Sequence, residues 1–174
     1  MPDFKDIHYL SLGSRTQQEV YRFLCDTGIL QLVREYDPVL AGTYPLDIQI
    51  PGSDLDIICY APDLQVFASR LEHLFGSQED FILQTPIQIS PPATVARFQL
   101  MDYTIELFGQ ALPVTQQMAY RHLLVEWQLL ERYGKVFKEQ IIQLKASGLK
   151  TEPAFCQLLG IEGDPYSGLL QYIL

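Results

Sequence analysis

Apolar residues recur at helical spacing over residues 15–27, with Ser14 before them and Gly28 after them. Serine is a favoured helix N-cap and glycine a common residue at a helix C-terminus, so this pattern predicts a helix with both ends defined. A second short helix is predicted over residues 29–35. The apolar residues 39–41 then predict a short buried strand that leads into a loop.

Residues 54–60 alternate in polarity, as a strand with one buried face does. Successive side chains of a strand point to opposite faces, so Asp54 and Asp56 share one face and the apolar residues between them share the other. Further along the chain, residues 95–100 and 103–108 predict a β-hairpin.

The remaining amphipathic segments predict helices over residues 64–75, 114–133 and 135–147, and a last one from about residue 151. Strands therefore gather in the first two-thirds of the chain and helices dominate afterwards. This order predicts the α+β class, with a mixed β-sheet, flanking helices and a helical C-terminal half. No long linker divides the 174 residues, so we expect a single domain with a sheet-bearing core at about 15–110 and a helical part at about 114–174.

The composition argues against several classes of protein. The chain is 48% apolar, which is too high for disorder, and it has no run of about 18 uncharged apolar residues that would cross a membrane. Residues 1–6 are acidic where a signal peptide is basic and apolar. The three cysteines are widely spaced and form no CxxC pair, so neither a disulfide framework nor a zinc site is indicated. We expect a cytoplasmic protein without a membrane partner.

The net charge and its distribution along the chain indicate which kinds of ligand the protein binds. The net charge of −9 opposes binding to the backbone of long nucleic acid. Residues 121–150 are the exception, with six basic and three acidic residues. This distribution predicts a basic wall facing an acidic body, which suits a small anionic ligand held together with a metal ion.

The two strand aspartates are the clearest chemical signal. Asp54 and Asp56 lie two residues apart on one strand face, where their mutual repulsion would raise one pKa. A divalent cation such as Mg²⁺ or Mn²⁺ would remove that penalty. Glu106 supplies a third carboxylate if its strand adjoins residues 54–60. Three acids that hold one or two such ions would suit phosphoryl or nucleotidyl transfer.

Gly42 and Thr43 are candidates for the phosphate-binding half of such a site. A glycine lets backbone N–H groups approach a phosphate closely, and a threonine hydroxyl can hydrogen-bond its oxygens.

In this order, the residues resemble the DNA polymerase β-like nucleotidyltransferases. Longer segments of the chain are similar to one bacterial family of unknown function within that superfamily: residues 42–47, 51–59, 117–122 and 149–155. The resemblance implies a nucleotidyltransferase-like fold and a nucleotide triphosphate substrate. It implies Gly42 and Thr43 as phosphate-loop residues, and Asp54, Asp56 and Glu106 as metal ligands and catalytic residues.

The sequence departs from the superfamily pattern in three respects. Thr43 stands where glycine or serine is usual, although it keeps a hydroxyl group. Pro45 and Pro51 disfavour the short helix that often precedes the aspartates. Glu106 stands where aspartate is commoner, which puts the spacing of the metal ligands in question.

Several of these residues also have purely structural interpretations. Asp54 fits a turn before a strand, and Glu106 fits a solvent-facing strand position. Lys150 is either a phosphate contact or merely the residue before a helix that Thr151 caps and Pro153 begins. His122 fits a packed or glutamate-paired histidine better than a catalytic one.

Three functions remain open at this point. The first is transfer of NMP from an NTP to an unknown small-molecule or protein acceptor, with a hydroxyl, phosphate or amine as the accepting group. The second is a catalytically degenerate binding or regulatory module of the same fold, in which arginine or backbone donors hold Asp54 and Asp56. The third is hydrolysis of a nucleotide polyphosphate. The acceptor, the base preference and the formation of a homodimer are left open by the sequence.

Overall fold

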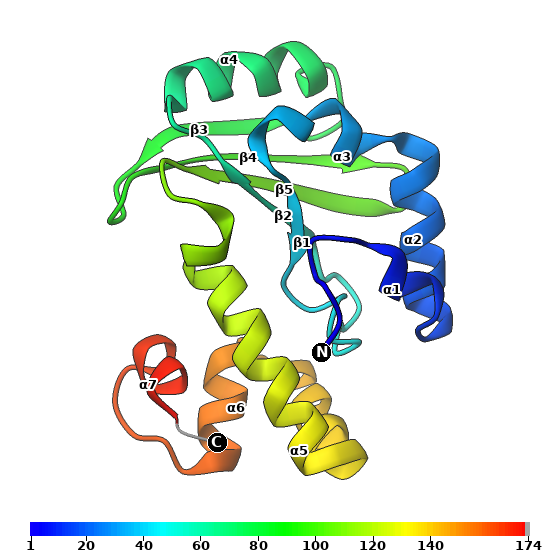
Figure 1. Cartoon of the computed structure of the whole chain (residues 1–174), viewed down its shortest axis with the longest axis vertical. Coiled ribbons are helices and arrows are strands. Elements are labelled where there is room, and N and C mark those ends of the chain that lie inside the picture. The colour runs from blue at the N-terminus through cyan, green and yellow to red at the C-terminus, as the bar shows by residue number, and fades with distance from the viewer. Residues whose placement is uncertain (173–174) are drawn as a thin grey trace.

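A five-stranded mixed β-sheet organises the first two-thirds of the chain, as the computed structural model of residues 1–172 shows (Figure 1). Its strands, in the spatial order β1-β2-β5-β4-β3, are β1 (Val39–Ala41), β2 (Leu55–Tyr60), β5 (Tyr103–Gln110), β4 (Ala93–Leu100) and β3 (Ile82–Ile87). Strands β2 and β5 run parallel, and the other neighbours are antiparallel. The predicted α+β class with a mixed sheet is confirmed.

The helices flank the sheet and form the C-terminal third. The α-helices are α1 (His8–Ser11), α2 (Arg15–Thr27), α3 (Ile29–Leu32), α4 (Leu64–Phe75), α5 (Met118–Ala146), α6 (Thr151–Leu159) and α7 (Pro165–Gln171). Two 3-10 helices, η1 (Arg34–Tyr36) and η2 (Val114–Gln116), complete the elements. Within residues 1–172, no helix is both long and apolar enough to cross a membrane.

The predicted capping of α2 is confirmed in detail. The Ser14 side chain accepts a hydrogen bond from the Gln17 backbone N–H, and the Gln17 side chain accepts one from the Ser14 backbone N–H. Gly28 ends the helix in the left-handed conformation. Each cap satisfies backbone groups that the helix itself leaves without partners.

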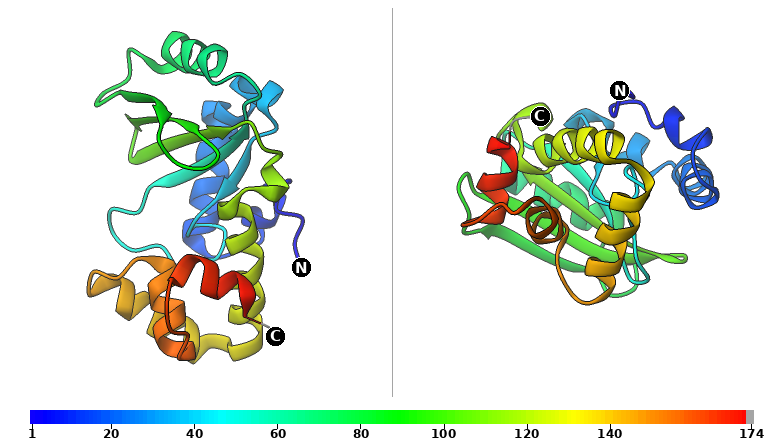
Figure 2. Two further views of the ribbon diagram at one scale, coloured as in Figure 1. Left: turned by 90° about the vertical axis from the view of Figure 1, so that its left-hand side faces the viewer. Right: turned by 90° about the horizontal axis from the view of Figure 1, so that it is seen from below.

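One face of the sheet is closed by a large apolar core. Leu55, Ile57 and Leu107 point to this face and are fully buried against helices α2 and α4. The alternating pattern of β2 therefore directs the other set of side chains, which includes Asp56, to the opposite face. Figure 2 shows that α5, α6 and α7 lie on that side of the molecule, below the sheet in Figure 1.

The C-terminal helices have a core of their own, built around Phe155, Leu129 and Ile141. Helix α5 is interrupted at Gly134, whose φ of 72° and ψ of −162° are not helical. The break agrees with the two helices expected on either side of residue 134, although the first begins at Met118 rather than at residue 114.

Strand β3 was not predicted. Its alternation is weak, it contains Pro86, and it lies at the edge of the sheet with half of its side chains exposed. Edge strands tolerate proline because one row of their backbone groups needs no partner. The short helices α1 and α7 were missed as well, since four and seven residues carry too little periodicity.

Candidate active site

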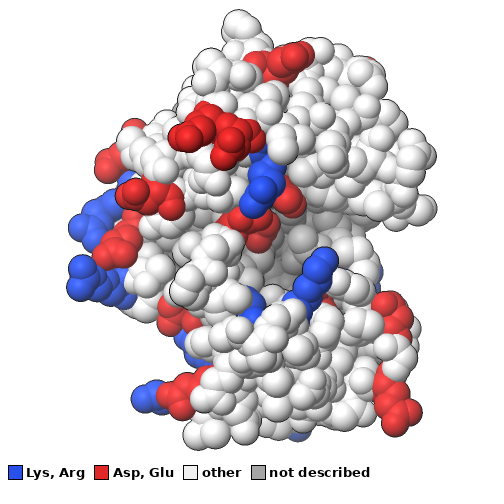
Figure 3. Space-filling model, turned by 180° about the vertical axis from the view of Figure 1, so that it is seen from behind, with Lys and Arg blue, Asp and Glu red and all other residues white. Residues whose placement is uncertain are grey.

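A cavity of about 1110 Å³ separates the open face of the sheet from helices α5 and α6. The space-filling view in Figure 3 shows a hollow between the sheet-bearing part and the helical part. Acidic side chains and a basic one lie together on its upper rim, and a basic side chain lies on its lower rim. Cavities of this size accommodate ligands as large as a nucleotide. All six candidate site residues line the cavity: Gly42, Thr43, Asp54, Asp56, Glu106 and Lys150.

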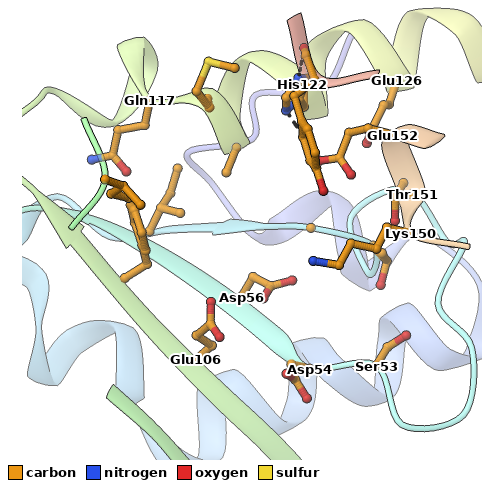
Figure 4. A pocket seen from close by; sticks show the side chains of 18 of the residues that line it. Ser53, Asp54, Asp56, Glu106, Gln117, His122, Glu126, Lys150, Thr151 and Glu152 are labelled. Carbon is orange, nitrogen blue, oxygen red and sulfur yellow. Dashed lines mark hydrogen bonds and ion pairs between the residues drawn. The ribbon is translucent and has the colours of Figure 1, made fainter. Parts of the chain in front are cut away.

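Asp56 and Glu106 lie side by side on the sheet wall of the cavity. They are register partners on the parallel strands β2 and β5, so the condition that Glu106 belongs to an adjoining strand is met. Figure 4 shows both side chains on the same side of the sheet. Parallel pairing places the side chains of register partners on one face, and it brings these two carboxylates together.

The two carboxylates are electrostatically strained. Burial in the cavity, and then repulsion from Glu106 and Asp54, raise the pKa of Asp56 to about 7. Burial and repulsion from Asp54 also raise the pKa of Glu106, while Arg97 and Lys150 oppose the shift. None of the ion pairs in the described part of the chain includes Asp56 or Glu106. An added cation would therefore relieve both groups.

Gly42 approaches the Asp56 carboxylate so closely that only glycine fits. A Cβ atom at this position would overlap Oδ2 of Asp56, and the φ of 68° is itself a conformation that glycine favours. Next to it, the Thr43 hydroxyl is buried, lines the cavity and finds no hydrogen-bond partner within residues 1–172. The predicted loop thus presents backbone and a free hydroxyl beside the carboxylates.

Asp54 has a partner inside the protein. An Arg97 guanidinium nitrogen lies 3.4 Å from Asp54 Oδ1, and both side chains are partly exposed. Within residues 1–172, no three His, Cys, Asp or Glu side chains converge as a ready-made metal site. The structure therefore brings Asp56 and Glu106 together but does not complete the three-carboxylate cluster with Asp54.

The residues present fit a hard divalent cation at the Asp56–Glu106 pair. Carboxylate oxygens are the ligands that Mg²⁺ prefers, and it commonly takes only one or two of them, together with water and substrate phosphates. Burial and repulsion between carboxylates, which the neighbouring cations oppose only in part, are the observation that favours such an ion. Asp54 would join it in competition with Arg97.

Lys150 projects into the cavity from the start of α6. Figure 4 shows its side chain extending from the helical wall toward Asp56. The assignment of Thr151 as the helix cap was wrong: Lys150 is the N-cap residue, Thr151 is the first helical residue, and no side chain caps this end. Thr151 therefore lines the cavity instead of capping the helix.

The helical wall carries charged residues whose role the sequence interpretation missed. Glu126 and Lys145 are only 4% and 5% exposed, and both line the cavity. Lys145 Nζ donates a hydrogen bond to the backbone oxygen of Ile48 at 2.8 Å. The available signal was helical spacing, because residues 122, 126, 137, 141 and 145 all fall on the buried face of α5.

Burial is the main cause of the pKa shifts of the charged residues on this wall. It raises the pKa of Glu126 to about 8, with repulsion from Glu152 as a smaller cause, and it lowers the pKa of Lys145 to about 8. His122 contacts Glu152 (Nδ1 to Oε1, 3.5 Å) and the backbone oxygen of Tyr166 (Nε2 to O, 2.8 Å). The histidine is packed and paired with a glutamate, as expected, and the partner is Glu152.

The predicted basic wall is only partly present. Of the six basic residues in 121–150, two line the cavity, Lys145 and Lys150. Lys138 instead pairs with Asp47 of the loop before β2, at 2.7 Å. Arg121 and Arg132 are exposed outside the cavity. Most basic side chains of residues 121–150 therefore face solvent or pair with residues outside the cavity.

The fold is that of the nucleotidyltransferases. The polymerase core of TRAMP, an RNA surveillance complex, superimposes with a TM-score of 0.52 at 15% identity, over 94% of this chain and 50% of that one. The Cid1 poly(U) polymerase in its Mg 3'-dATP complex superimposes with a TM-score of 0.56 at 13% identity, over 90% of this chain and 48% of that one. An H336N mutant of Cid1 bound to MgATP superimposes with a TM-score of 0.57 at 11% identity, over 90% of this chain and 49% of that one. The chain thus spans about half the length of these polymerases.

The chain belongs to the family described as "Domain of unknown function (DUF4269)", whose model matches residues 22–172. No match to this sequence was found among curated proteins. The expected membership of a family of unknown function and the expected nucleotidyltransferase-like fold are confirmed.

Proposed function

We propose that the protein is a metal-dependent nucleotidyltransferase that transfers NMP from an NTP to a small-molecule or protein acceptor. The observation that carries the proposal is the Asp56–Glu106 pair, two repelling carboxylates on adjoining strands beside the glycine loop and Lys150 in one large cavity. The Cid1 structures bound to MgGTP and MgATP support the same ligand class, since they share this fold.

Each group has a distinct role in the proposed reaction. Gly42 and Thr43 would contact the triphosphate through backbone N–H groups and a hydroxyl, and Lys150 would balance its charge. An acceptor hydroxyl would attack the α-phosphorus, and the bond from that phosphorus to the bridging oxygen would break, releasing pyrophosphate. The hydroxyl proton would pass to Asp56 or Glu106. Mg²⁺ bound there would supply charge neutralisation at the triphosphate.

We infer that the sheet and the helical part act together as one domain. The cavity takes Asp56 from the sheet and Lys150 from the helices, so neither part holds the site alone. A bacterial origin, a cytoplasmic location and a homodimer remain predictions, as do the exclusion of long nucleic acid and of a membrane partner.

A degenerate binding module is the second candidate, because Arg97 holds Asp54 as that alternative predicts. Asp56, by contrast, has no such partner in the described ion pairs, which favours the enzyme. In a degenerate module, nucleotide binding would be independent of Mg²⁺ and no product would form.

Calorimetry with each NTP, with and without Mg²⁺ or Mn²⁺, tests the proposal. Binding should require the metal ion and should be lost in the double variant Asp54→Asn/Asp56→Asn. The double variant Asp80→Asn/Asp102→Asn makes the same charge change at exposed positions and should bind normally. Indifference of the wild type to every NTP and metal ion would refute the proposal. Product analysis with an α-labelled NTP separates transfer from polyphosphate hydrolysis.

A further inference from the structure

Glu126 has a buried carboxylate oxygen with nothing to bind. The residue is 4% exposed, and its Oε1 has no hydrogen-bond partner within the described part of the chain. It lines the same cavity as Asp56 but comes from the helical wall, where Figure 4 shows it beside His122 and Glu152. A buried acceptor without a partner costs free energy, so a ligand that donates to it would recover that cost.

The charged neighbours of Glu126 make their hydrogen bonds and ion pairs with other groups. Lys145 donates to the Ile48 backbone oxygen, and it forms no ion pair with Glu126 within residues 1–172. Glu152 pairs with His122. Lys150 extends away from this group toward Asp56. Glu126 is therefore the member of this group whose buried oxygen, Oε1, has no hydrogen-bond partner among the described residues.

The two walls of the cavity consequently favour ligands of opposite charge. Gly42, Thr43 and Lys150 offer donors and positive charge, which suit phosphate groups. Once Glu126 has lost its proton, the group formed by Glu126, Glu152 and Lys145 carries a net charge of −1 when Glu152 and Lys145 are ionised. An anion would be repelled there, whereas one ammonium group would both satisfy Oε1 and neutralise the wall.

We propose that Glu126 forms a cation-binding subsite that recognises an ammonium group on the acceptor substrate. The inference rests on the proposed function, because it assigns the part of the helical wall around Glu126 to the acceptor. The ammonium group serves as the binding handle of the acceptor. Raising of the Glu126 pKa to about 8 by burial supports the assignment, since the empty subsite would hold a proton that the ligand cation replaces.

The test compares n-butylammonium with n-butanol, which has a similar shape but no charge, by calorimetry near neutral pH. The wild type should bind the amine and not the alcohol, with release of a proton detected as a dependence of the enthalpy on the buffer. Glu126→Gln should weaken amine binding by about tenfold or more, the effect of a charged hydrogen bond. The matched control Glu162→Gln removes one exposed acid outside the cavity and should change nothing.

Equal amine binding by Glu126→Gln, or alcohol binding as tight as amine binding, would overturn the inference. Titration of the same samples with ATP and Mg²⁺ separates this failure from failure of the proposed function. Glu126→Gln should retain metal-dependent nucleotide binding, which also shows that it is folded. Amine binding that depends on Glu126, in a protein that binds no nucleotide, would refute the proposed function and leave the cation subsite standing.

Discussion

Asp56 of β2 and Glu106 of β5 are register partners on two parallel strands, and their carboxylates share the open face of the sheet. Residues fifty positions apart are thereby held together by backbone pairing alone. Since this pairing fixes the two carboxylates before any ligand binds, the repulsion between them is built into the fold. Substitutions around the pair should therefore change the free energy of unfolding and the affinity for ligands, and the two effects can be measured separately.

Gly42→Ala should abolish metal-dependent nucleotide binding and destabilise the protein. The left-handed φ alone costs an alanine roughly 1–2 kcal/mol, and the new Cβ would also displace the Asp56 carboxylate. Gly163→Ala is the matched control, because its φ of 89° is also positive while a Cβ there meets nothing within 4 Å. Thermal melts and calorimetry should show loss of stability in both variants and loss of binding in Gly42→Ala alone. Normal nucleotide binding by Gly42→Ala would contradict the close approach to Asp56.

Glu126→Gln should be more stable than the wild type above pH 5. The pKa of Glu126 is raised from 4.5 to about 8, so the folded state binds more protons than the unfolded state between these values. Wild-type stability should therefore fall as the pH rises through this window, and removal of the carboxylate should reduce the fall. Asp56, with its pKa raised to about 7, should account for part of the decline that remains.

Urea unfolding from about pH 5 to pH 8 measures this difference, with an expected gap on the order of 1 kcal/mol or more at the upper end. Lys145 has its pKa lowered to about 8, so its contribution to stability should rise only above that pH, outside the window. Parallel curves for the two proteins would show that Glu126 is not an uncompensated charge.

Arg97→Gln should tighten Mg²⁺ binding in the presence of ATP by a factor of about two to five. Arg97 would compete with the metal ion for Asp54, and it also attracts Glu106, because it opposes the rise in the pKa of that carboxyl. Arg15→Gln breaks an exposed pair with Glu19 and serves as the control. Weaker Mg²⁺ and ATP binding in Arg97→Gln would instead make Arg97 a contact of the triphosphate.

Asp47→Asn should destabilise the loop that leads to β2. The Asp47 carboxylate accepts hydrogen bonds from Ser14 Oγ at 2.6 Å and from Lys138 Nζ at 2.7 Å, which links the loop to α2 and α5. Hydrogen bonds to charged groups contribute roughly 1.5–3 kcal/mol each, so a loss of about 2 kcal/mol is expected in chemical unfolding. In a double-mutant cycle with Lys138→Met, the losses should be clearly less than additive. Additive losses would show that the pair contributes nothing.

The elements around the site could be predicted because local rules fix them. The alternation in residues 54–60, the Ser14 cap and the helix end at Gly28 each depend on neighbouring residues, and the structure agrees with each. The pairing of β2 with β5 could only be assumed from the sequence, because the order of strands in a sheet does not depend on neighbouring residues alone. Once the strand order is known, the register with Asp56 fixes the face of the sheet to which the Glu106 side chain points.

Other features of the site depend on tertiary structure that no local pattern encodes. Arg97 reaches Asp54 because β4 pairs with β5, and Lys145 is buried because α5 packs over the loop at Ile48. Residues 121–150 predicted a continuous basic wall from composition alone, yet the helix distributes those side chains around its circumference. Of the basic residues on α5, only Lys145 lines the cavity, and Lys150 reaches it from the start of α6.

The central claim is that Asp56 and Glu106 hold a divalent cation together with a nucleotide triphosphate. Electron paramagnetic resonance of Mn²⁺, titrated into the protein with a non-hydrolysable ATP analogue, measures the bound ion directly. Bound Mn²⁺ should appear in the wild type and in the exposed control Asp102→Asn, and it should be lost in both Asp56→Asn and Glu106→Gln. Undiminished Mn²⁺ binding in those two variants would contradict the claim.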